Sequence, residues 1–275
     1  MKNKITQVIK SRIFEYILLS LIIILGFFVR LYKINSPILD WHSWRQADTA
    51  SVSRIYVEKG INLLLPRYHD ISSIQSGISN PMGYRMVEFP FYNAITVLAV
   101  NALPKFSLEV WARLITIFTA IVTSFFLYLI GKRLMGKWGG LLSAFFYLFI
   151  PFNIYFTRVI LPDPMGVMFG IISLWAFLEF TYNEKKILLY VSSIFFSMAL
   201  LIKPYLGFYI FPFIYLALRK YGIKKFLIDR KVIINSVLFF ILAFVPFILW
   251  RMWEGRFPEG IPFYEWAFNG NLIRF

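Results

Sequence analysis

Cysteine is absent from the 275-residue chain, which excludes a structural disulfide, a thiolate nucleophile and a zinc-thiolate centre. Charged residues are also scarce, at 16% of the chain, whereas hydrophobic residues make up 59% and the mean hydropathy is +0.67. This is more apolar surface than one water-soluble core can bury. The composition therefore predicts an all-α polytopic membrane protein.

Acidic residues are few, at 14 against 29 basic residues, and the formal net charge is +15. A charge of this size is common among nucleic-acid-binding proteins. Here, however, the basic residues lie in short clusters between apolar runs, as they do in cytoplasmic membrane-protein loops. We therefore predict contact with the lipid bilayer and no nucleic-acid partner.

Seven apolar runs are candidate membrane spans. The first, residues 14–32, follows a basic N-terminal cluster and has no small-residue cleavage site after it, so we expect a retained span with a cytoplasmic N-terminus. Six more are expected within residues 111–250, with an outer tail at 251–275. Their apolar runs are Trp111 to Gly131, Trp138 to Thr157, Pro164 to Tyr182, Ile187 to Ile202, Pro204 to Leu218 and Val232 to Trp250.

Residues 33–110, between the first two spans, are too polar to be buried as a whole. Apolar residues at helical spacing predict an interfacial helix near 48–59, and Ser43 with Gln46 fits a capping box just before it. Residues 91–103 are apolar but short for a span. If they do not cross, one side of the membrane gathers 15 of the 29 basic residues and only 4 of the 14 acidic ones. This asymmetry favours seven spans, with 33–110 as an outer loop and 91–103 as an interfacial helix.

The predicted outer loop begins with a dense polar stretch, Asp40-Trp-His-Ser-Trp-Arg-Gln-Ala-Asp-Thr49. Asp40 or Asp48 is a candidate general base toward an acceptor hydroxyl, and the residues leave open which of them acts. A turn and a helix start explain the two carboxylates equally simply. His42 is a candidate substrate contact; as a lone histidine it could be a metal ligand, a proton shuttle or simply a hydrogen-bonding interfacial residue. Trp44 suits either a sugar platform or the aromatic belt of a membrane interface.

Further candidates lie elsewhere on the predicted outer side. Asp163, in Leu161-Pro-Asp-Pro164, is a further catalytic candidate because it faces the same side as the first loop. An ordinary helix start, with Asp163 as N-cap and Pro164 as the first helical residue, also explains it. Glu88 precedes the short helix and is a candidate for orienting a substrate. Four basic residues are available to bind a phosphate: Arg45, Arg85, Arg158 and Lys203. No predicted span carries a charge near its middle, which disfavours an ion-coupled transporter.

The order of these features resembles the C-type glycosyltransferase superfamily: a first span, an outer loop with acidic residues near its start, Glu88-Phe-Pro90 opening an interfacial helix, and Asp163 in the next outer loop. The branch it resembles most holds protein O-mannosyltransferases and lipid A aminoarabinose transferases. Trp44-Arg-Gln-Ala-Asp-Thr49 resembles the signature of a bacterial subgroup. With the helix aligned on Ala50, Arg45 falls where that family usually has Asp and Asp48 where it has a basic residue.

The resemblance implies a cell-envelope glycosyltransferase in the plasma or inner membrane. Its donor would be a sugar on a polyprenyl phosphate, transferred with inversion at the outer face to an acceptor that the sequence does not identify. A divalent metal is left open. Members usually continue well past the seventh span, so three expectations stay open: a truncated chain, a minimal member, or a protein that needs a partner subunit to supply the remaining half. A lipid-linked sugar flippase and a non-catalytic membrane scaffold are the alternatives.

Overall fold

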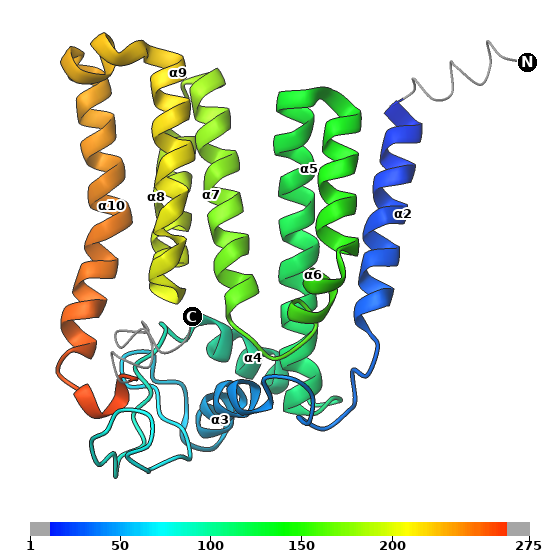
Figure 1. Cartoon of the computed structure of the whole chain (residues 1–275), viewed down its shortest axis with the longest axis vertical. Coiled ribbons are helices and arrows are strands. Elements are labelled where there is room, and N and C mark those ends of the chain that lie inside the picture. Colours follow the sequence, from blue (N-terminus) through cyan, green and yellow to red (C-terminus); the bar gives the residue numbers. More distant parts are fainter. Residues whose placement is uncertain (1–11, 263–275) are drawn as a thin grey trace, which may run out of the picture.

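The computed structural model describes residues 12–262 as a bundle of helices (Figure 1). Within this range the chain forms no strand beyond an isolated bridge between Arg67 and Tyr84. The elements are α2 (Arg12–Arg30), α3 (Ser43–Lys59), α4 (Phe91–Ala102), α5 (Leu108–Phe149), α6 (Pro151–Phe156), α7 (Asp163–Asn183), α8 (Lys186–Ile202), η1 (Pro204–Tyr209), α9 (Ile210–Ile228), α10 (Arg230–Glu254) and η2 (Pro258–Gly260).

The long helices run side by side between two ends of the molecule (Figure 1). Helix α5 contributes two antiparallel arms because it reverses at Gly136, which has a φ of +73° that favours glycine. The arms approach closely: a Cβ on Gly140 would lie 2.6 Å from the Tyr128 carbonyl oxygen. Small residues permit such helix contacts inside a bilayer. Together with α2, α7, α8, α9 and α10, these arms make seven helical rods in the described part of the chain.

Length and hydropathy support membrane insertion. Helices α2, α5, α7 and α10 are each long and apolar enough to cross a bilayer, and α4 and α8 are shorter apolar helices. Helices suit this environment because they satisfy their backbone hydrogen bonds internally. The predicted fold class, an all-α polytopic membrane protein, is confirmed.

We call the end of the bundle that carries α3 and α4 the loop end (Figure 1). Helix α4 has only 12 residues, fewer than the roughly 20 needed to cross a bilayer. It packs on α3 and α5: Asn93 Nδ2 donates to the Thr49 carbonyl oxygen over 2.7 Å, and the Tyr92 hydroxyl donates to the Ala112 carbonyl oxygen over 2.6 Å. Residues 60–90 pass over the same end without regular structure.

The capping box predicted at Ser43 and Gln46 is wrong. Helix α3 begins at Ser43, five residues earlier than predicted, and its N-cap His42 has a φ of +58° and makes no side-chain capping bond. Gln46 instead donates to the Asp40 carboxylate over 2.6 Å, because tertiary contacts outweigh the local capping pattern. Similarly, Asp163 is the first residue of α7, and the N-cap is Pro162.

The opposite end holds the start of α2, the Gly136 turn, the α7–α8 link and the α9–α10 link (Figure 1). We call it the basic end because Lys132, Lys186, Lys220 and the residues around Lys225 gather there. The predicted tail, 251–275, starts in α10 and includes η2. Its residues 263–275 lie outside the described part.

Candidate active site

Helix α3 carries Arg45 and Asp48 one turn apart, so both point from one side of the helix. Arg45 Nη2 lies 2.7 Å from both carboxylate oxygens of Glu88. Both side chains are largely buried, at 12% and 8% exposure. The pair joins α3 to the segment that leads into α4.

Lys203 links Glu88 to Asp163. Its Nζ atom lies 3.7 Å from Glu88 Oε2 and 3.7 Å from Asp163 Oδ1. The Tyr205 hydroxyl donates to Asp163 Oδ1 over 3.2 Å. Backbone contacts hold this arrangement, since the Phe89 amide donates to the Leu201 carbonyl oxygen over 2.9 Å. Residues far apart in the sequence therefore form one ion-pair network, Arg45–Glu88–Lys203–Asp163.

Burial and neighbouring charges shift the pKa values of two residues in this ion-pair network, Glu88 and Arg45. Burial disfavours ionised Glu88, but the positive charges of Arg45, Lys203 and Arg85 outweigh it and lower the pKa of Glu88 to about 2. Burial likewise opposes the charge of Arg45, yet Glu88, Asp163 and Asp48 raise the pKa of Arg45 above its usual value. Both groups are therefore ionised at neutral pH.

Asp48 lies next to this ion-pair network and pairs with side chains of the irregular loop. Arg85 Nη2 lies 3.1 Å from Asp48 Oδ2, and Gln75 Nε2 donates to the same oxygen over 2.9 Å. Arg85 also donates to Gln75 and stacks over the Tyr68 ring at 4.9 Å. Burial and the nearby charge of Arg45 lower the pKa of Arg85. Asp48 is thus committed to a buried network under the 66–86 loop.

Asp40 is held on the other side of α3. Gln46 donates to Asp40 Oδ1 over 2.6 Å and accepts from the Ile160 amide over 3.2 Å. Arg158 Nη2 lies 3.7 Å from Asp40 Oδ2, and its guanidinium lies over the rings of Tyr32 and Tyr155. Asp40 therefore connects the start of the loop to the segment just before α7.

A cavity of about 480 Å³ opens among α3, the α6–α7 segment and η1. Five of the ten predicted site residues line it, namely His42, Trp44, Arg45, Asp163 and Lys203. Its other walls are Tyr147, Phe152, Asn153, Phe156, Thr157, Leu161, Pro164, Val167 and Tyr205. The other five predicted residues are at the loop end but do not line the cavity: Asp40, Asp48, Glu88, Arg85 and Arg158.

Three of the participating residues were not among the site candidates predicted from the sequence. Tyr205 lines the cavity and contacts Asp163, Gln46 holds Asp40, and Gln75 holds Asp48. Tyr205 sits two residues after Lys203, across a proline that ends α8, so its place beside a predicted basic residue was the available signal. Gln46 lies inside the Trp44–Thr49 motif, but the sequence assigned it to a capping box. Gln75, in the irregular loop, had no comparable signal.

The carboxylates of this site do not fit a bound metal ion. Among residues 12–262, no three His, Asp or Glu side chains are arranged to hold one. The position between Glu88 and Asp163 is taken by the Lys203 ammonium, which pairs with both carboxylates. No step is therefore assigned to a metal.

The fold and the site define a helical membrane protein with a cavity at one end that combines cations, a carboxylate and aromatic walls. Residues 89–250, more than half of the chain, match the family described as dolichyl-phosphate-mannose-protein mannosyltransferase. The chain belongs to this family, which confirms the resemblance to its branch of the C-type glycosyltransferases.

A solved structure agrees with this assignment at the level of the fold. The crystal structure of ArnT from Cupriavidus metallidurans bound to undecaprenyl phosphate matches with a TM-score of 0.62 and 15% sequence identity. The match covers 91% of this chain and 43% of ArnT, so the chain spans less than half the length of that protein. A comparison with curated proteins gives no match.

Proposed function

We propose that the protein is a membrane glycosyltransferase that takes a sugar from a polyprenyl phosphate and passes it to an acceptor hydroxyl. The observation that carries the proposal is the 480 Å³ cavity, which brings Arg45, Lys203 and Asp163 together with apolar and aromatic walls. Membership of the mannosyltransferase family supports it. So does the undecaprenyl phosphate bound to ArnT, which shares the fold.

In this proposal the cations of the cavity receive the phosphate. Arg45 and Lys203 are 12% and 16% exposed, so they present charge to the cavity with little competing water. A phosphodiester leaving group departs as a stable anion, and fixed positive charge stabilises it without a general acid. The side chains of Phe152, Phe156 and Val167 offer apolar contact to the start of the prenyl chain.

We assign the general base to Asp163. It is the one predicted catalytic carboxylate that lines the cavity, and a third of its side chain is exposed. Its carboxylate takes the proton of the acceptor hydroxyl, the acceptor oxygen bonds to the anomeric carbon, and the bond from that carbon to the phosphate oxygen breaks on the opposite side. This displacement inverts the anomeric centre. Asp40 and Asp48 then act as positioning residues, through Gln46 and Arg85 respectively.

We further propose that the loop end faces the non-cytoplasmic side of the plasma or inner membrane. Basic residues favour the cytoplasmic side, and the basic end gathers them with few carboxylates. Nucleotide-activated sugars are not available beyond that membrane, so a lipid-carried donor is consistent with this placement.

The test uses membranes containing the protein, with undecaprenyl phosphate linked to tritiated mannose as the donor probe. Asp163→Asn is expected to lower the rate of transfer by about 10²- to 10⁴-fold, the usual contribution of a general base. Binding of undecaprenyl phosphate should remain. Lys203→Gln should instead weaken that binding by about ten- to a hundredfold, as expected for a lost charged contact.

Asp70→Asn is the matched control, because Asp70 lies on the same loop and accepts only the nearby Ser72 amide among the described hydrogen bonds. It should leave both measurements unchanged. Transfer that survives Asp163→Asn but is lost in Asp40→Asn or Asp48→Asn would move the base to that residue. A wild-type protein that neither binds undecaprenyl phosphate nor releases it from the donor would contradict the function.

A further inference from the structure

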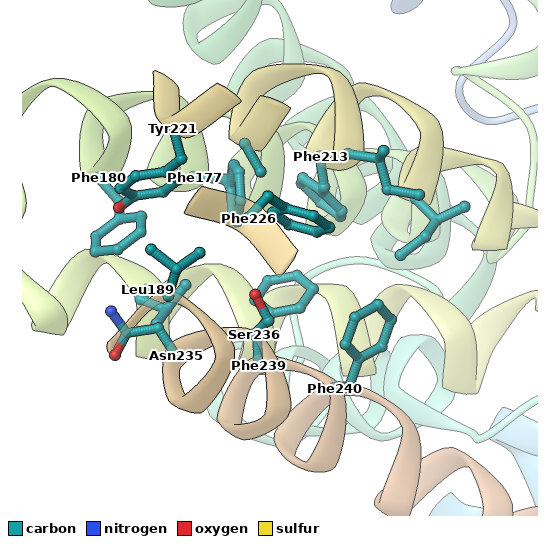
Figure 2. Close-up of a pocket in the computed structure, with 14 residues that line it drawn as sticks. Phe177, Phe180, Leu189, Phe213, Tyr221, Phe226, Asn235, Ser236, Phe239 and Phe240 are labelled. Carbon is teal, nitrogen blue, oxygen red and sulfur yellow. The ribbon is translucent and has the colours of Figure 1, made fainter. Parts of the chain in front are cut away.

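A second cavity lies at the basic end, away from the candidate active site. It has a volume of about 270 Å³ and is enclosed by α7, α8, α9 and α10. Phenylalanine dominates its walls, with Phe177, Phe180, Phe213, Phe226, Phe239 and Phe240 (Figure 2). Figure 2 shows Phe239 and Phe240 of α10 facing Phe213 and Phe226 of α9 across the cavity. The interior suits a hydrocarbon chain.

The cavity has access to the lipid-facing surface. Ile214 on α9 and Phe240 on α10 line it, yet they are 39% and 42% exposed. These two side chains mark an opening between the two helices. A hydrocarbon chain can therefore enter sideways from the bilayer without crossing the aqueous end of the bundle.

A polar cleft of about 320 Å³ continues from this cavity toward the basic end. The two spaces share four lining residues, among them Asn235 and Tyr221. Four lysines line the cleft, against two carboxylates: Lys186, Lys220, Lys225 and Lys231, with Glu184 and Asp229. Apolar interior and basic mouth therefore form one continuous amphiphilic site.

The charge of the cleft is only partly neutralised by the protein. Lys220 Nζ pairs with Glu184 at 3.0 Å, and Asp229 accepts from the Lys231 amide as the N-cap of α10. Lys186, Lys225 and Lys231 have exposed side chains and form no ion pair within the described residues. The four lysines of the cleft outnumber its two carboxylates, so the cleft keeps a net positive charge that is available to an anion.

We propose that this site binds an anionic membrane phospholipid, with its phosphate among the lysines and part of one acyl chain between α9 and α10. Positive charge selects an anionic headgroup, and the Phe-lined interior selects a chain. The small volume admits part of one chain, so the second chain stays in the bilayer. The site lies at the end of the bundle opposite the candidate active site and does not depend on the proposed transferase activity.

The test measures lipid retention by native mass spectrometry after release from nanodiscs that contain equal amounts of phosphatidylglycerol and phosphatidylcholine. The wild-type protein should retain phosphatidylglycerol in clear preference to phosphatidylcholine. If each lysine that lines the cleft contributes about fivefold in affinity, as a basic residue at an anionic lipid surface does, Lys225→Gln with Lys231→Gln should lower the preference by about 25-fold.

The matched control is Lys224→Gln with Arg230→Gln, which removes two charges from the same segment but from residues that line neither space. It should keep the preference. Ala217→Leu, which fills part of the apolar cavity, should reduce retention of phosphatidylglycerol while thermal unfolding in detergent confirms that the bundle is intact.

Equal retention of the two lipids by the wild type would overturn the proposal. The same loss in the control double variant would also overturn it, because general charge would then explain the preference. Undecaprenyl phosphate is added as a competitor in a separate arm. Displacement of phosphatidylglycerol by an equimolar amount would overturn the assignment of a phospholipid as the occupant.

Discussion

Arg45 and Glu88 form a buried ion pair between residues 43 positions apart, with Nη2 2.7 Å from each carboxylate oxygen. Glu88→Gln removes the charge that compensates Arg45, and breaking a buried pair in this way costs about 3–5 kcal/mol of folding free energy. Replacing both residues, as Arg45→Met with Glu88→Leu, should cost less because Arg45 is no longer buried without its partner, and Lys203 keeps its pairing with Asp163. Thermal unfolding in detergent measures both. A single variant that is no less stable than the double variant would contradict the role of the pair.

The same carboxylate should make stability depend on pH. The folded-state pKa of Glu88 is about 2, below the ordinary value of 4.5. A lowered pKa contributes stability that is complete above about pH 4.5 and is lost as the pH falls toward about 2. The shift corresponds to roughly 3 kcal/mol. The midpoint of thermal unfolding should therefore fall steeply over this window in the wild type. In Glu88→Gln it should fall less, and equal slopes in both proteins would exclude Glu88 as the cause.

Much of the fold could be predicted from the sequence, because apolar runs predict the long helices and basic clusters predict the links between them. The turn at Gly136 falls between the predicted spans 111–131 and 138–157, as a glycine between apolar runs indicates. The second of these runs is interrupted, however, since α5 ends at Phe149 and α6 follows from Pro151. Pro204 similarly begins the short η1 before α9, because proline removes a backbone donor.

The residues of the site were harder to connect than to find. Composition and position marked Arg45, Glu88, Lys203 and Asp163 as separate candidates, but their pairing depends on how the loop crosses the bundle end. The exchanged charge order at Arg45 and Asp48 illustrates this point. Each is paired with the opposite charge of a later segment, Glu88 and Arg85. Sequence spacing contains no information about such tertiary contacts.

Tyr205→Phe is expected to lower the turnover number of the proposed transfer by about fivefold, because it removes one hydrogen bond of about 1 kcal/mol from Asp163. The KM for the polyprenyl phosphate donor should stay the same, since the phenol contacts the carboxylate and the ring remains. Steady-state kinetics separates the two effects. Tyr215→Phe is the control, because Tyr215 is 63% exposed on α9. A raised KM with unchanged turnover would assign Tyr205 to donor binding instead.

Gly136→Ala should destabilise the hairpin that the two arms of α5 form. Gly136 has a φ of +73°, and no atom lies within 4 Å of the position that a Cβ would take. With a ψ of −174° this is a backbone conformation that essentially only glycine adopts. The cost therefore comes from backbone strain alone and amounts to about 1–3 kcal/mol. Gly207→Ala is the matched control, because its backbone is not left-handed and the nearest atom to a Cβ would lie 3.7 Å away. Thermal unfolding of both variants in detergent measures the difference. If the two substitutions have equal effects, the reversal at Gly136 does not require glycine.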